Sequence, residues 1–61
     1  MTAFTIVASK DGETVTTVRL GPKISVEKAL GLVEDGWQVH ITASEGRQYT
    51  PDQFHQVLQL D

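Results

Sequence analysis

The 61-residue chain contains no cysteine, which removes two common ways of stabilising a small domain. Neither a disulfide framework nor a thiolate-ligated zinc cluster can form without cysteine. Two histidines are also too few for an all-histidine zinc site. A chain without cysteines fits a reducing compartment, so we expect a cytoplasmic protein.

Long apolar runs are missing as well, so we expect no membrane span. The N-terminal stretch MTAFTIVASKDGE lacks both a basic n-region and a long apolar h-region, and we expect no signal peptide. Lys and Arg number 5 against 8 Asp and Glu, for a formal charge of −3. A net negative chain is poorly suited to non-specific binding of polyanions.

Motifs that carry catalysis or phosphate binding are also absent from the sequence. No serine lies in a nucleophile elbow, and the glycines are isolated from one another instead of forming a phosphate-binding loop. Asp11 and Glu13 flank a turn glycine, and we interpret both as solvated turn residues. We therefore expect that the protein is not an enzyme, and we predict no catalytic residue, no cofactor and no metal ligand.

Alternating apolar and polar residues predict a first strand from Ala3 to Ser9, with its even-numbered side chains buried. The stretch from Thr14 to Leu20 is rich in β-branched residues and predicts a second strand. A two-residue turn at Asp11 and Gly12 would bury the odd-numbered side chains of the second strand. A three-residue loop that also includes Lys10 would bury Val18 and Leu20. Because the second choice gathers more apolar side chains, we predict the three-residue loop.

The middle of the chain predicts a helix followed by a second pair of strands. Ser25 is a candidate N-cap, and Gly36 suits the position that follows a helix. An amphipathic stripe at helical spacing is formed by Val26, Ala29, Leu30 and Val33. Alternation returns from Trp37 to Ala43, and a three-residue turn then leads to a short strand at Arg47 to Tyr49.

Four local signals mark the start of a last helix, which we expect to run to Leu60. Thr50 is a suitable N-cap, Pro51 fits the first helical position, and Gln53 completes a capping box. A hydrophobic staple joins Tyr49 to Phe54. The apolar stripe of this helix is formed by Phe54, Val57 and Leu58.

Burial of these stripes predicts one α+β domain over residues 1–61. We expect a three- to four-stranded, mainly antiparallel sheet with element order ββαβ(β)α and two helices on one face. The helical crossover makes the third strand parallel to the second, and pairing of the third strand with the first gives the order 2-1-3. A parallel 1-2-3 arrangement is the alternative. The ββα order repeats in shortened form from Trp37, which raises the hypothesis of an internal duplication.

The sheet face opposite the helices is the most informative predicted surface. We expect it to carry Thr5, Val7, Val15, Thr17, Arg19, Gln38, His40 and Thr42. Val7 and Val15 would then form an apolar pair on a threonine-rich face. His40 on this face and His55 on the last helix would be separated by the sheet.

Two function hypotheses follow from this surface. The first is a small, non-enzymatic interaction domain that binds a protein partner or a second copy of itself through the open face or the edge strand. The second is a nucleic-acid-associated regulatory domain that uses the same face. Nucleic-acid platforms use stacking aromatic residues and clustered Lys or Arg. The predicted face has one Arg, one His and no Phe, Tyr or Trp, so we favour the first hypothesis.

Overall fold

The computed structural model of the chain describes residues 2–60 and begins with a β-hairpin. Strand β1 spans Ala3–Lys10 and strand β2 spans Glu13–Leu20. Lys10 pairs directly with Glu13, so the connecting turn has two residues. Asp11 and Gly12 both have positive φ, at 52° and 82°, which is the type I′ geometry that suits an Asp-Gly pair.

This turn contradicts the predicted three-residue loop and reverses the faces of β2. Phe4 pairs with Arg19 and Ala8 pairs with Val15, so the odd-numbered side chains of β2 lie on the helix side of the sheet. Val18 and Leu20 are exposed instead of contributing to the core. The physical reason is that β2 is an edge strand with little burial, so the turn decides its register.

Helix α1 spans Pro22–Glu34 and crosses from β2 to the next strand. Its N-cap is Gly21 and Pro22 occupies the first turn, so the prediction of Ser25 as N-cap is wrong. Ser25 is fully buried within the helix, and its hydroxyl donates to the Gly21 carbonyl at 2.7 Å. The predicted apolar stripe is confirmed at Val26 and Ala29, but Leu30 lies on an exposed flank.

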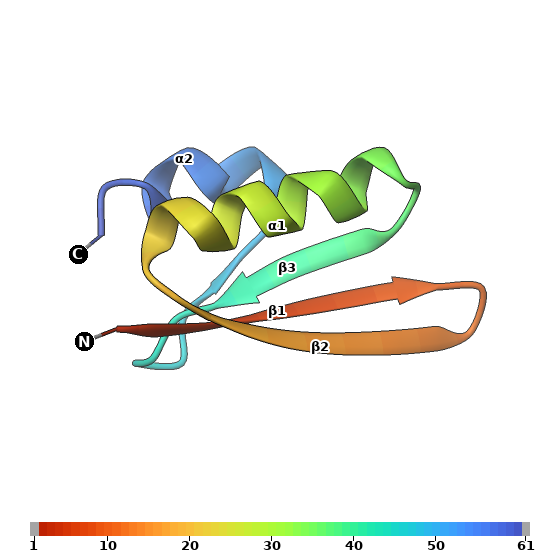
Figure 1. Cartoon of the computed structure of the whole chain (residues 1–61), viewed down its shortest axis with the longest axis horizontal. Coiled ribbons are helices and arrows are strands. Elements are labelled where there is room, and N and C mark those ends of the chain that lie inside the picture. Colours follow the sequence, from red (N-terminus) through yellow and green to blue (C-terminus); the bar gives the residue numbers. More distant parts are fainter. Residues whose placement is uncertain (1, 61) are drawn as a thin grey trace.

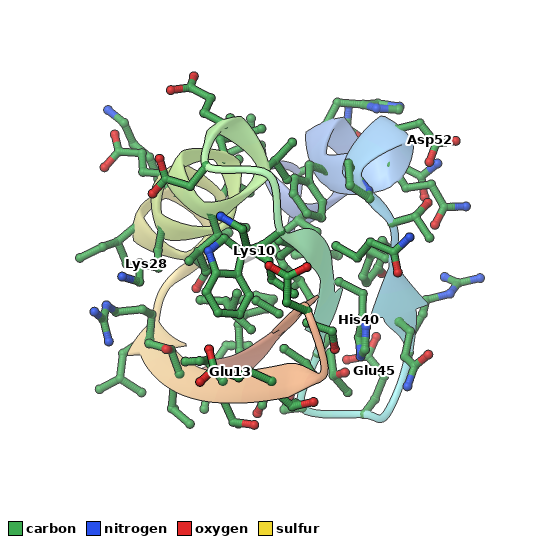
Figure 2. All side chains as sticks on the ribbon, turned by 90° about the vertical axis from the view of Figure 1, so that its right-hand side faces the viewer. Lys10, Glu13, Lys28, His40, Glu45 and Asp52 are labelled. Atoms are coloured by element: carbon green, nitrogen blue, oxygen red, sulfur yellow. The ribbon has the colours of Figure 1, made fainter. Side chains whose placement is uncertain are left out.

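Helix α1 ends at a glycine, as predicted, in a Schellman arrangement. The backbone N–H of Gly36 donates to the Val33 carbonyl, and the N–H of Trp37 donates to the Leu32 carbonyl, both at 3.0 Å. Lys10 reaches across from β1, as Figure 2 shows, and its Nζ donates to the Asp35 carbonyl at 2.7 Å. The same ammonium lies 5.7 Å from the centre of the Trp37 ring. The ammonium of Lys10, which belongs to β1, thus offsets the partial negative charge at the C-terminal end of α1.

Strand β3 spans Gln38–Thr42 and strand β4 spans Gln48–Tyr49, giving one sheet in the order β2-β1-β3-β4. All three neighbouring pairs are antiparallel, so β2 and β3 run parallel on either side of β1. The predicted α+β architecture and the 2-1-3 order are confirmed. The three-residue turn predicted between β3 and β4 is also confirmed, because Ile41 pairs with Tyr49 and both are buried.

The C-terminal segment starts as predicted but is less helical. A 3₁₀ turn, η1, spans Pro51–Gln53, and helix α2 spans only Phe54–Val57. The capping box is present, with the Thr50 N–H donating to Gln53 Oε1 at 3.1 Å. Leu58 is exposed rather than part of the buried stripe, because α2 ends before it.

Figure 1 shows both helices on one side of the sheet and none on the other. The core lies between these two layers, and Trp37 packs at its margin. Its buried apolar residues are Phe4, Ile6, Ala8, Val26, Ala29, Val39, Ile41, Ala43, Tyr49, Phe54 and Val57. The element order repeats as ββαββα, although the two hairpins use turns of different length.

Candidate interaction surface

The side of the sheet that faces away from the helices is an open face built mainly by β1, β2 and β3. Strand β1 places Phe4, Ile6 and Ala8 in the core, so its odd-numbered side chains point to the open face. The pairing of β1 with β3 then determines which side chains of β3 share this face. Five residues predicted for this face are there: Thr5, Val7, Gln38, His40 and Thr42.

The three residues predicted for this face from β2 are on the other side. Val15, Thr17 and Arg19 pair with Ala8, Ile6 and Phe4, whose side chains point to the helices. This part of the prediction is wrong, and so is the predicted Val7–Val15 contact. Val7 pairs with Thr16 instead. The two-residue turn shifts the register by one and turns every side chain of β2 over.

The open face therefore receives Thr14, Thr16, Val18 and Leu20 from β2. Val18 is 54% exposed and Leu20 is 59% exposed, the largest values among the exposed large hydrophobic residues described. Leu20 pairs with Ala3, and Val18 is diagonal to Val7. We call Ala3, Val7, Val18 and Leu20 the open-face patch. The Asp-Gly dipeptide was the sequence signal that could have located Val18 and Leu20, because it favours a two-residue turn.

Strand β2 also forms a free edge of the sheet. One hydrogen bond shows which of its residues bond to β1 and which have backbone groups that point outward. The N–H of Gly21 donates to the Thr2 carbonyl at 3.1 Å, which extends the β1–β2 ladder by one step. Antiparallel strands bond to a given neighbour through alternate residues. The odd-numbered residues of β2 therefore bond to β1, and the backbone groups of Thr14, Thr16 and Val18 point outward. We call this outward-facing backbone the β2 edge.

Few features protect the β2 edge from pairing with another strand. The five residues from Thr14 to Val18 carry no charge, and all of them are β-branched. Arg19 supplies partial protection, since its Nη1 donates to the Val18 carbonyl at 2.9 Å. The opposite edge of the sheet is formed by the two-residue β4. Short edge strands and charges discourage pairing, and β2 is eight residues long with charges only near its ends.

The two histidines lie on opposite sides of the sheet, as predicted. His40 projects from β3 on the open face, and Figure 2 shows it on the side away from the helices. His55 is exposed on α2. Within residues 2–60, no group of three or more His, Cys, Asp or Glu side chains is placed to hold a metal ion.

A shallow hollow of about 440 Å³ lies beside β3, where β4 pairs only with Ile41 and Thr42. Its lining combines apolar side chains such as Trp37 and Pro51 with the single titratable side chain of His40. In the described part of the chain, no hydrogen bond orients the His40 ring toward a hydroxyl or carboxylate partner.

Over residues 2–60, no helix has the length and apolar character needed to cross a membrane. Comparisons with models of protein families, with curated proteins and with solved structures found no match for this chain.

Proposed function

We propose that the chain is a small, non-enzymatic interaction domain of the cytoplasm that binds another protein through the β2 edge and the open-face patch. The observation that carries this proposal is the exposure of Val18 and Leu20, at 54% and 59%, beside an eight-residue free edge strand. A strand with unpaired backbone groups on one side and apolar side chains on one face fits recognition by strand addition.

Burial of the exposed side chains on this surface would contribute to binding. Fully burying a Val or Leu side chain stabilises by about 1.5–3 kcal/mol, so covering the exposed halves of Val18 and Leu20 contributes roughly 2 kcal/mol together. Backbone groups on the β2 edge would add hydrogen bonds that fix the orientation of the partner strand. A domain near the lower size limit also gains more from such burial than a large one.

The alternative, a nucleic-acid-associated domain, has less support after the faces are corrected. Arg19 leaves the open face, and the described strand positions on that face then hold His40 but no Lys, Arg, Phe, Tyr or Trp. Single-stranded nucleic acids are bound by stacking on aromatic rings beside basic side chains. We therefore retain the protein-binding function as the proposal.

Affinity capture with a matched pair of variants tests this function. The wild type, Leu20→Lys and Leu30→Lys are each immobilised and exposed to an extract of the source cells with and without nuclease. Leu30 is the control because it is also exposed, at 44%, but lies on α1 in the helical layer. We expect the wild type and Leu30→Lys to retain the same protein and Leu20→Lys to lose it.

Two results would contradict the proposal. Equal capture by Leu20→Lys and Leu30→Lys would remove the open-face patch as the contact region. Loss of all captured protein after nuclease treatment would favour the nucleic-acid function instead.

A further inference from the structure

We propose that β2 pairs antiparallel with β2 of a second copy of this chain, so that two four-stranded sheets join into one. This inference rests on the proposed function for the β2 edge alone: the strand that this edge binds is β2 of a second copy, and the open-face patch stays accessible to another protein. The partner must present a free edge strand of similar length, with outward-facing backbone groups at alternate residues. Strand β2 itself meets that requirement.

Along β2, backbone groups point alternately toward β1 and away from it. This alternation restricts how two copies of β2 can pair. Hydrogen-bonded pairs require outward-facing residues on both strands, so Thr14, Thr16 and Val18 must face one another across the interface. Two-fold symmetry further requires that each residue pair occurs twice, except for a pair on the axis. Registers centred on Thr16 or on Thr17 both satisfy these conditions.

Charge complementarity selects the register centred on Thr16. In that register, Glu13 of each copy lies opposite Arg19 of the other copy, and Thr14 lies opposite Val18. Glu13 and Arg19 share the helix side of the sheet, so their side chains meet on the same face. With Thr17 on the axis, Arg19 would face Val15 and Glu13 would face Gly21. The only two charges on β2 thus form two symmetric opposite-charge pairs in one register.

The contact that Arg19 makes within one chain fits this arrangement. Its guanidinium donates to the Val18 carbonyl, which would accept from the Thr14 N–H of the second copy. Pairing therefore displaces the guanidinium from the carbonyl, and Glu13 of the second copy lies opposite to receive it. Arg19 would cover the β2 edge in the free chain and become an interface residue in the dimer.

The resulting dimer is small and keeps the open face accessible. Three hydrogen-bonded residue pairs would supply about six backbone hydrogen bonds between the copies. An interface of this size belongs to weak, reversible association. The two-fold axis is perpendicular to the sheet, so both helical layers lie on one side and both open-face patches lie on the other.

A charge-swap experiment followed by sedimentation equilibrium tests the pairing and its register together. Glu13→Arg alone places two arginine side chains opposite each other, and Arg19→Glu alone places two glutamate side chains opposite each other. We expect each variant to self-associate about tenfold more weakly than the wild type, because both symmetric pairs become repulsive. An equimolar mixture of the two variants should recover association, because every pair across that interface is again of opposite charge.

Two further variants serve as controls for charge and folding. Arg47→Glu makes the same charge change as Arg19→Glu in the β3–β4 turn, and it should associate like the wild type. Thr16→Pro removes an outward-facing N–H without removing a β1–β2 hydrogen bond, so it should abolish the dimer and keep the monomer fold.

A wild type that remains monomeric at high concentration would overturn self-pairing, while the capture experiment would still decide the proposed function. A dimer that the mixture fails to restore, or that Thr16→Pro leaves intact, would overturn the edge-to-edge register. A dimer disrupted by Leu20→Lys and unaffected by the charge swaps would place the contact on the open face instead.

Discussion

The turn between β1 and β2 determines which side chains the sheet exposes, and substitutions at Asp11 test its geometry. Asp11 has a φ of 52° and Gly12 a φ of 82°. An ordinary L-residue in this left-handed region costs about 1–2 kcal/mol, whereas Asp and Asn tolerate it better. Asp11→Ala should therefore lower the free energy of unfolding by about 1 kcal/mol, and Asp11→Asn should raise it by a few tenths of a kcal/mol.

Asp11→Gly separates the observed turn from a three-residue loop. In the observed turn, glycine relieves steric cost but adds entropy to the unfolded chain, so the net change should be close to zero. In a three-residue loop, residue 11 would have negative φ, so alanine would be tolerated and glycine would cost about 0.5–1 kcal/mol. Urea denaturation measures the difference, because 1 kcal/mol corresponds to a midpoint shift of roughly 1 M for a chain of this size. A neutral Asp11→Ala together with a destabilised Asp11→Gly would refute the two-residue turn.

Three further predictions concern the packing and the histidines. Phe54→Ala should lower the free energy of unfolding by about 3 kcal/mol because Phe54 is buried, while Leu58→Ala should change it by less than about 0.5 kcal/mol; urea denaturation of both variants checks this contrast. Lys10→Met should cost about 1 kcal/mol, since it removes the ammonium from the end of α1 and from the Trp37 ring, and thermal melts would show no loss if these contacts contribute nothing. When zinc is added and the NMR signals of the histidine rings are monitored, His40 and His55 should not saturate together. A one-to-one transition that involves both rings would contradict their separation by the sheet.

Much of the fold was predictable where burial and local chemistry agree. The alternation in β1 and β3 predicted the central strands, and both are buried on one face. The start of the C-terminal segment was predicted from Thr50 and Gln53, because a capping box is a local signal. Its end was not predictable in the same way, since no capping residue marks where α2 stops.

The error in the candidate site came from applying a burial argument where burial is weak. For the second hairpin, Ile41 and Tyr49 are both in the core, so gathering apolar residues gave the correct loop. On β2, residues of both faces remain exposed, including Val15 at 41% and Val18 at 54%. The energetic difference between the two registers is therefore small, and the preference of Asp-Gly for a type I′ turn decides it.

The proposals depend most directly on the register that places Val18 and Leu20 on the open face. Nuclear Overhauser effects between Hα protons measure this register, because Cα atoms in non-hydrogen-bonded antiparallel pairs lie only about 4.5 Å apart. We expect strong Hα–Hα contacts between Val7 and Thr16 and between Thr5 and Val18 in a dilute sample. A contact between Ile6 and Thr16 in their place would shift the strand by one residue, bury Val18 and Leu20, and contradict the interaction surface.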